Sequence, residues 1–279
     1  MTDGGGSTDG TLPDDGGSGS DGSGGNPNAP ANDRCANATA ISIDPMQTTL
    51  AATTAGANAD LAAPCGVAGT PDVFFKFTLT RRELVYADTF STTGNTALYF
   101  ASSCSTARTA ATTDGDAVCS TAACGTGQSQ VVALLDPGTH YLVLAGSGAA
   151  TIHFQHSQVG AGSVTQLPAG SSTINGTTSG SGTLYACDAG GAENAYWWRT
   201  CPGDAGGAFH SSTCTGTTWD TMMSLQMPGS EATLCDDDTC SLQSSVTANI
   251  PAGAGLFVVS VDGFSQSKHG DYTLTTSRP

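Results

Sequence analysis

Short apolar runs, separated by glycine, proline, asparagine and aspartate, follow one another from residue 34 to the C-terminus. In residues 72–79, DVFFKFTL, the side chains of Val73, Phe75 and Phe77 fall on one face and polar or other side chains on the opposite face. This period of two is typical of a half-buried strand. Short strands punctuated by turn residues are typical of antiparallel sandwiches. The pattern therefore predicts an all-β fold.

The same pattern recurs in both halves of the chain. In the first half, further strands are predicted at residues 83–90, 95–101, 129–135, 139–146 and 151–156. In the second half, strands are predicted at residues 195–199, 220–226, 244–250, 256–263 and 271–276. Glutamate and lysine, which favour helices, are rare, and this composition supports the same conclusion.

The two halves repeat each other. The ten cysteines divide five and five, and the offsets 235 − 119 = 116 and 240 − 124 = 116 place two of them identically ahead of matching apolar runs. The turn glycines Gly138 and Gly253 differ by 115. We therefore expect a tether at residues 1–33, a first sandwich domain at 34–158 and a second at 159–279.

The tether prediction rests on residues 1–33, which contain almost no apolar side chains to offset the entropy of ordering. Acidic Gly/Ser segments of this kind resemble those that follow the lipidated cysteine of bacterial surface lipoproteins. That resemblance implies an N-terminal lipid anchor as the only membrane contact, although the cysteine itself is absent here.

A formal net charge of −16 argues against nucleic acid and anionic lipid as main partners. No run approaches the roughly 20 apolar residues that span a bilayer. Ten cysteines indicate an oxidising compartment. We therefore expect an exported protein, extracellular or on the outer cell surface. No secretory signal is recognisable, so we expect that the export signal is not in this chain.

The order of these elements resembles the bacterial pre-peptidase C-terminal domain. The residues that carry the resemblance are DVFFKF, NTALYF and LDPGTHYLVLAG in the first half, and Asp220-Thr221, CDDDTC, Pro251-Ala252-Gly253, LFVVSVDG and GDYTL in the second. The resemblance implies two tandem jelly-roll-like antiparallel β-sandwiches. It also implies an accessory role in binding or in supporting an enzyme, with calcium bound in some members.

The cysteines favour disulfides over a zinc site, because no Cys-x-x-Cys pair is present. Their spacing leaves the connectivity open. The pairings considered are Cys35–Cys65, Cys119–Cys124, Cys201–Cys214 and Cys235–Cys240, with Cys104 and Cys187 joined across the domains or free, and Cys104–Cys119 as a competing choice.

The densest carboxylate cluster is Asp236, Asp237 and Asp238, between two cysteines and with Asp220 expected nearby. Calcium takes about six to eight oxygen ligands and tolerates irregular loops, so these four residues are a candidate calcium site. The spacing is not that of an EF-hand, and a solvated acidic turn is the alternative interpretation.

Tyr196, Trp197, Trp198 and Trp219 concentrate the aromatic side chains of the second half and are a candidate sugar-binding platform. Adjacent residues of a strand face opposite sides, so one of Trp197 and Trp198 should belong to the core. The other is expected at the surface, against the neighbouring domain or on a binding face.

No catalytic motif is recognisable. G-x-S-x-G and H-E-x-x-H are absent, no orienting partner can be named for any histidine, and His153 and His156 are three apart on a strand and so face opposite sides. A Ser/His/Asp grouping stays open among the many serines. The sequence thus predicts a non-catalytic binding, adhesion or structural protein that engages a protein, a polysaccharide or further copies of itself.

The alternative hypothesis is a secreted hydrolase or peptidase-accessory subunit with an unrecognised site. A concave pocket holding a hydrogen-bonded nucleophile and base would favour catalysis. Flat sheets with an exposed aromatic patch would favour binding or assembly.

Overall fold

The computed structural model describes residues 26–66, 68–108, 117–180, 182, 187, 190–230 and 232–279. These residues form four sheets and one short 3-10 turn, η1 (Cys35–Asn37). No helix in this part of the chain is long and apolar enough to cross a membrane. The predicted all-β fold class is confirmed.

The first two sheets pack into one sandwich, called here the first sandwich. One sheet has the order β1 (Thr39–Ala40), β3 (Asp72–Leu79), β9 (Gly138–Gly146), β5 (Thr96–Ser103) and β6 (Thr106–Ala107), with β7 (Cys119–Ser120) also paired to β5. The other has the order β2 (Gln47–Thr53), β10 (Ala149–Gln158), β4 (Glu83–Asp88) and β8 (Gln130–Leu135).

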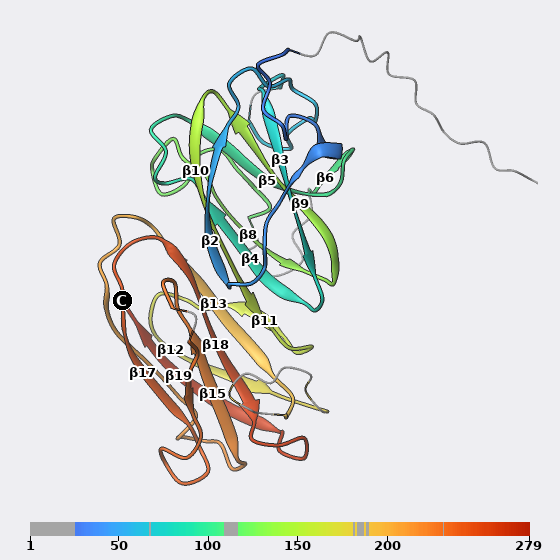
Figure 1. Cartoon of the computed structure of the whole chain (residues 1–279). Helices are drawn as coiled ribbons and strands as arrows, with labels where there is room; N and C mark the ends of the chain where they lie inside the picture. The colour runs from blue at the N-terminus through green and yellow to red at the C-terminus, as the bar shows by residue number, and fades with distance from the viewer. Residues whose placement is uncertain are drawn as a thin grey trace, which may run out of the picture.

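The remaining two sheets form the second sandwich with the same strand order. One sheet runs β11 (Val164–Gln166), β13 (Asn194–Thr200), β18 (Gly255–Gly263), β15 (Thr221–Gln226) and β16 (Leu234–Asp236). The other runs β12 (Gly170–Thr177), β19 (Asp271–Arg278), β14 (Gly207–Ser212) and β17 (Ser245–Ile250). Two facing sheets interleaved in this order are a jelly roll, and each carries one extra parallel edge strand. Figure 1 shows the two sandwiches one beyond the other.

The repeat extends to a buried hydroxyl network. In the first sandwich, Thr89 and Thr96 share a hydroxyl hydrogen bond of 2.6 Å, and the amide of Thr89 donates to the carbonyl of Ser129 at 3.0 Å. In the second, Thr213 and Thr221 share a bond of 2.8 Å, and Thr213 donates in the same way to Ser244. Corresponding positions can therefore be compared residue by residue, with Thr89 matching Thr213.

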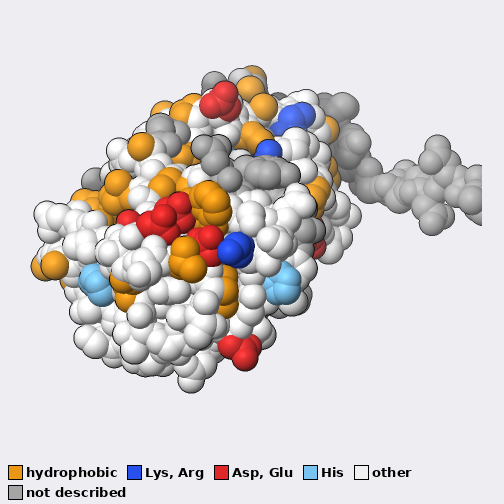
Figure 2. Space-filling model, turned by 90° about the horizontal axis from the view of Figure 1, so that it is seen from below, with side chains coloured by type: hydrophobic (Ala, Val, Ile, Leu, Met, Phe, Trp, Pro, Cys, Tyr) orange, Lys and Arg blue, Asp and Glu red, His pale blue; other side chains and the backbone are white. Residues whose placement is uncertain are grey.

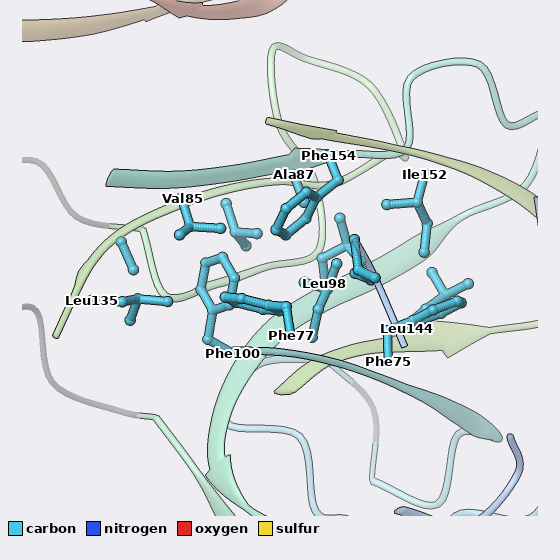
Figure 3. Packing of buried hydrophobic residues seen from close by; sticks show 14 of the residues in the cluster. Phe75, Phe77, Val85, Ala87, Leu98, Phe100, Leu135, Leu144, Ile152 and Phe154 are labelled. Atoms are coloured by element: carbon cyan, nitrogen blue, oxygen red, sulfur yellow. The ribbon is translucent and has the colours of Figure 1, made fainter. Parts of the chain in front are cut away.

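Each sandwich has its own apolar core. The core of the first is built from inward-facing side chains of both sheets, among them Phe75, Phe77, Phe100 and Phe154 (Figure 3). In the second, the ring of Trp198 stacks between Phe209 and Phe257. The strand alternation seen in the sequence therefore places the inner face as expected.

A third apolar cluster joins the two sandwiches. The outer face of β4 and β8 contributes Leu84, Tyr86, Val132 and Leu134, and these pack against the outer face of the second sandwich. Trp197 lies in this cluster, fully buried, together with Val159, Val164, Ala195, Leu256 and Val258. Strands at this junction are buried on both faces, which explains the unbroken apolar runs VVALL and LFVV.

The end of the predicted tether belongs to the first sandwich. Residues 1–25 lie outside the described part of the chain. Asp33 is buried and accepts hydrogen bonds from the backbone amide (2.6 Å) and side-chain amide (2.8 Å) of Asn58, and Asn32 donates to the carbonyl of Phe74. Residues 32 and 33 are therefore fixed by contacts that composition alone does not reveal.

The disulfide connectivity differs from each pairing considered from sequence. The bonds are Cys35–Cys104, Cys65–Cys119, Cys124–Cys201, Cys187–Cys235 and Cys214–Cys240. No described cysteine is free. Neighbouring cysteines do not pair because each is carried by a different strand or loop that meets a distant segment. Cys124–Cys201 is the bond that links the two sandwiches.

Removing the bond between the sandwiches should lower stability without unfolding either one. We expect C124S/C201S to lose roughly 2–4 kcal/mol of unfolding free energy, the usual contribution of a disulfide. The apolar junction remains in place in this variant. Denaturant unfolding of oxidised protein measures the loss, and C214S/C240S, which removes a bond inside the second sandwich, is the matched control. Unchanged stability in C124S/C201S would contradict a structural role for the link.

Candidate functional site

A groove of about 740 Å³ lies between the two sandwiches. Strands β2, β4 and β10 and the turn after β4 form the wall contributed by the first sandwich. The second sandwich contributes the residues Pro202, Pro228, Gly229, Gly253, Ala254 and Gly255. The groove therefore exists only because the sandwiches are docked.

Side-chain amides hold the two walls of the groove together. The amide of Gln155 bonds both backbone groups of Leu256, at 2.7 and 3.1 Å, as a neighbouring strand would. Gln47 accepts a bond from the amide of Gly229 at 2.8 Å. The buried amide of Gln155 and the more exposed amide of Gln47 thus fix the spacing of the walls as well as their contact.

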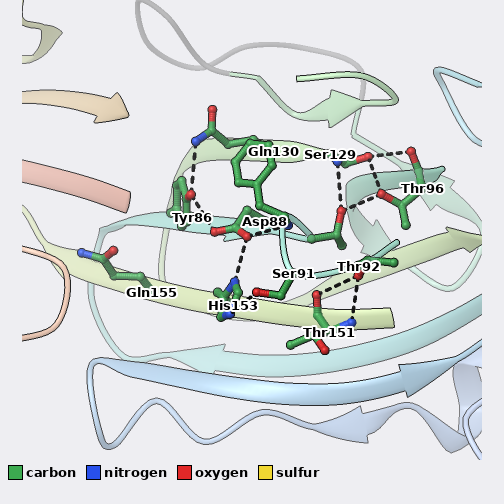
Figure 4. Close-up of polar contacts among 12 residues, drawn as sticks. Tyr86, Asp88, Ser91, Thr92, Thr96, Ser129, Gln130, Thr151, His153 and Gln155 are labelled. Carbon is green, nitrogen blue, oxygen red and sulfur yellow. Dashed lines mark hydrogen bonds and ion pairs between the residues drawn. The ribbon is translucent and has the colours of Figure 1, made fainter. Parts of the chain in front are cut away.

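Asp88, His153 and Ser91 form a hydrogen-bonded row in this groove (Figure 4). His153 Nδ1 lies 2.9 Å from Asp88 Oδ1, and His153 Nε2 lies 3.3 Å from Ser91 Oγ. Asp88 and His153 are direct partners across the β4–β10 ladder, which brings their side chains together. Because the carboxylate accepts the bond, Nδ1 carries the hydrogen and Nε2 is free to accept from the serine hydroxyl.

Further contacts orient the carboxylate of Asp88. Its Oδ2 accepts a bond of 2.7 Å from the Tyr86 hydroxyl, and its Oδ1 accepts one of 3.0 Å from the Phe90 amide. Gln130 donates to the Tyr86 oxygen at 3.1 Å and to the carbonyl of Thr200 in the second sandwich at 2.8 Å. The row is thus connected to the junction of the sandwiches through buried polar groups.

The position of Ser91 is set by a short turn. The amide of Thr92 closes the turn on the carbonyl of Thr89 at 2.8 Å, and the Thr92 hydroxyl accepts a bond from the amide of Thr151 on β10. The turn therefore lies against the strand that carries His153. Ser91 itself is exposed, and the His153 side chain is 39% exposed while that of Asp88 is 3% exposed.

The environment of His153 raises its affinity for a proton relative to a free imidazole. The hydrogen bond to Asp88 raises the pKa of His153 above its ordinary value, and partial burial opposes this only in part. His156, three residues along, is buried against Glu83 on the other face of the strand. The sequence pattern separated these two histidines correctly but gave no partner for either.

The predicted aromatic platform is wrong, because three of its four members are buried. Trp197 lies in the junction between the sandwiches, Trp198 is in the core of the second, and the Tyr196 hydroxyl bonds that of Tyr272 at 2.6 Å. Only Trp219 is partly exposed, and its Nε1 donates to the carbonyl of Asp271. No flat aromatic face remains there for a sugar ring.

Three of the four predicted calcium ligands lie together. Asp220, Asp237 and Asp238 each offer an oxygen within 4.8 Å of the others, the one such acidic group in the described chain. Asp236 is turned away, with its oxygens bonded to the Thr239 hydroxyl (2.6 Å) and the Ser245 amide (2.6 Å).

Charge repulsion and burial act together on the acidic turn. Burial first, and then the charges of Asp238, Asp220 and Asp236, raise the pKa of Asp237. Lys268 Nζ lies 3.5 Å from Asp220 and balances part of the charge. Figure 2 shows acidic side chains gathered beside hydrophobic ones on the end of the molecule seen there.

The comparisons with known proteins concern the first sandwich most directly. Residues 31–143 match a T9SS-associated family model described as galactose binding domain-like. This match includes Asp88 and Ser91, and it covers less than half of the chain. The pre-peptidase C-terminal name is not confirmed. No curated protein matches the sequence.

Solved structures with a similar arrangement are distant. A candidate secreted protein from Eubacterium rectale is 12% identical, covering 75% of this chain and 70% of that one with a TM-score of 0.22. A protein of the Sulfolobus Turreted Icosahedral Virus is 13% identical, covering 74% and 55% with a TM-score of 0.25. A Paenibacillus xanthan lyase is 13% identical, covering 77% and 23% with a TM-score of 0.21.

Two buried carboxyls, Glu193 and Asp262, lie in the second sandwich. Glu193 and Asp262 are each 3% exposed. Burial, with the nearby charge of Asp262, raises the pKa of Glu193 to about 8, and burial raises that of Asp262 to about 7. The Oε2 atom of Glu193 has no hydrogen-bond partner among the described residues. The folded protein therefore retains protons that the unfolded chain releases near the ordinary values of 4.5 and 3.8.

Stability should consequently fall as the pH rises from about 4 to about 8, because the folded state binds more protons than the unfolded state over that range. We expect E193Q to melt at a higher temperature than the wild type at pH 9 and to lose this advantage at pH 5. Thermal unfolding across this pH range provides the measurement.

Asp72 supplies the control for this prediction, since it has the corresponding strand position in the first sandwich. Burial also raises the pKa of Asp72, to about 6, but its carboxylate accepts bonds from the amides of Asp60 (3.2 Å) and Leu61 (3.0 Å). Because D72N loses these bonds, it should destabilise at both pH values. If E193Q had the same melting temperature as the wild type at every pH, the prediction that the buried charge of Glu193 is destabilising would be wrong.

Proposed function

We propose that this protein is an extracellular carbohydrate-binding protein whose ligand occupies the groove between the sandwiches. The galactose binding domain-like match carries the proposal, because it includes the β4 wall of the groove. The five disulfides support an extracellular location.

The lining of the groove suits a sugar. Threonine, glutamine, serine and histidine side chains supply hydrogen-bonding groups, and the partly buried ring of Phe90 offers an apolar surface. Specific small-molecule sites combine such a surface with a few oriented polar groups. The net charge of −16 disfavours a polyanionic ligand, so a neutral oligosaccharide is the better match.

Replacing the groove aromatic should weaken sugar binding. We expect F90A to bind galactose-containing oligosaccharides about tenfold less tightly, a loss of about 1.4 kcal/mol, because the apolar sugar face loses its contact. Array screening followed by titration calorimetry measures the affinity. F264A, which removes an exposed phenylalanine outside the groove lining, is the matched control. Equal affinity in F90A and the wild type would place the ligand elsewhere.

We also propose that calcium stabilises the acidic turn of the second sandwich. Cys235 and Cys240 are bonded to Cys187 and Cys214, so both ends of the turn are fixed before any ion binds. Binding would relieve the repulsion among Asp220, Asp237 and Asp238. A loop preorganised in this way loses less entropy on binding.

Calcium should therefore raise the melting temperature, and the shift should disappear in D238N. At a concentration of about 100 times Kd the gain is about 2.7 kcal/mol. Scanning calorimetry with calcium and then with chelator provides the test. D236N is the control, because Asp236 lies outside the group and its loss should leave the shift intact. The absence of any shift in the wild type would refute calcium binding.

A further inference from the structure

The row Asp88–His153–Ser91 has the connectivity of a catalytic triad. A carboxylate orients the imidazole at 2.9 Å, and the far nitrogen of that ring lies 3.3 Å from a serine hydroxyl. A nucleophile, a base and an orienting acid linked in this order activate serine in unrelated folds. The serine is exposed in a groove while the acid is buried, as the chemistry requires.

The backbone of the turn adds a further feature. The amide of Ser91 makes no hydrogen bond within the described part of the chain, whereas the amides of Phe90 and Thr92 on either side are both used. The amide of a nucleophilic serine commonly stabilises the oxyanion that forms on the attacked carbonyl. The unused N–H of Ser91 is therefore available for that role.

The internal repeat shows that the row is not part of the sandwich framework. The register that pairs His153 with Asp88 pairs Thr275 with Ser212 in the second sandwich, and Ser91 corresponds to Thr215. The hydroxyl network beside these positions is kept in both halves. A jelly roll of this kind thus forms without an Asp–His pair, and the pair occurs in the half whose strands β2, β4 and β10 line the groove.

We propose that Ser91 is the nucleophile of an esterase site that removes acyl groups from a carbohydrate bound in the groove. The acyl-ester chemistry follows from the row itself, and the choice of a carbohydrate carrier rests on the proposed function. Asp88 acts as a positioning residue, since it touches His153 and not the substrate.

The reaction proceeds in two balanced steps. Ser91 Oγ bonds to the acyl carbon while its proton moves to His153 Nε2, and that proton then passes to the leaving sugar oxygen as the ester bond breaks. Water next attacks the acyl-serine, giving its proton to His153, which returns a proton to Oγ as the acid departs. The sum is ester plus water giving carboxylic acid plus sugar hydroxyl.

The test uses the full oxidised chain with p-nitrophenyl acetate, an acetylated galactose oligosaccharide and a fluorophosphonate label. We expect the wild type to hydrolyse both esters and to be labelled at Ser91, identified by peptide mass. S91A should lose the label and lower kcat/KM about 10³-fold or more. T215A, the corresponding turn residue of the second sandwich, should retain full activity and labelling.

The positioning role of Asp88 can be tested separately, through the pH dependence of kcat/KM. The acidic limb of kcat/KM reports the pKa of the free base. The bond to Asp88 raises the pKa of His153, so D88N should move that limb to lower pH as well as reduce kcat. H153A should abolish activity, and a pH profile unchanged in D88N would remove Asp88 from the mechanism.

The outcomes separate the two proposals. Binding of the unacetylated oligosaccharide without Ser91-dependent hydrolysis or labelling would overturn the esterase and leave the carbohydrate site standing. Ser91-dependent hydrolysis of p-nitrophenyl acetate without sugar binding would support the triad and overturn the carbohydrate assignment. Equal rates in S91A and the wild type would overturn the esterase.

Discussion

The docking of one sandwich on the other through Trp197 and its apolar neighbours is the contact on which the rest of the molecule depends. The outer face of β4 and β8 would be an exposed apolar patch in an isolated first sandwich, because Leu84, Tyr86, Val132 and Leu134 all lie there. Such patches are unfavourable in water, at about 25 cal/mol for each Å² exposed. Burying them fixes the angle between the sandwiches and thereby creates the groove.

A chain of buried polar groups connects that junction to the Asp88–His153–Ser91 row. The carbonyl of Thr200 accepts from Gln130, which also bonds Tyr86, and Tyr86 holds Asp88. A buried chain of this kind has few alternative arrangements, because an unpaired member would cost about 1–3 kcal/mol. The orientation of the imidazole of His153 therefore depends on contacts made by the other sandwich, as well as on its own strand.

The two sandwiches differ at corresponding positions in and beside the groove. In the second sandwich Cys214 bonds Cys240, whereas the corresponding position of the first is Phe90. Cys124, the counterpart of Cys240, is thereby left to bond Cys201 across the junction. One position therefore accounts for two features, a ring that faces the groove and a covalent link beside it.

Strand alternation and the repeated cysteine spacing were sufficient to predict the fold class, because both are local properties of the chain. They also placed Trp198 and Trp197 on opposite faces, although only the three-dimensional packing shows that Trp197 meets the other sandwich. Disulfide partners and the Asp88–His153 pair are separated by dozens of residues, 65 in the latter case, and depend on strand register. Residue spacing in the sequence therefore does not predict the disulfide partners or the Asp88–His153 pair.

The carboxylate cluster was only partly predictable for the same reason. Adjacency in sequence suggested that Asp236, Asp237 and Asp238 act together, yet the backbone turns Asp236 toward the amide of Ser245 and brings Asp220 in from another strand end. The groove, in contrast, is a property of the assembled pair. A single sandwich would hold Asp88, His153 and Ser91 but would lack the opposite wall of the groove at Pro202, Pro228 and Gly253–Gly255, so the second sandwich completes the enclosure.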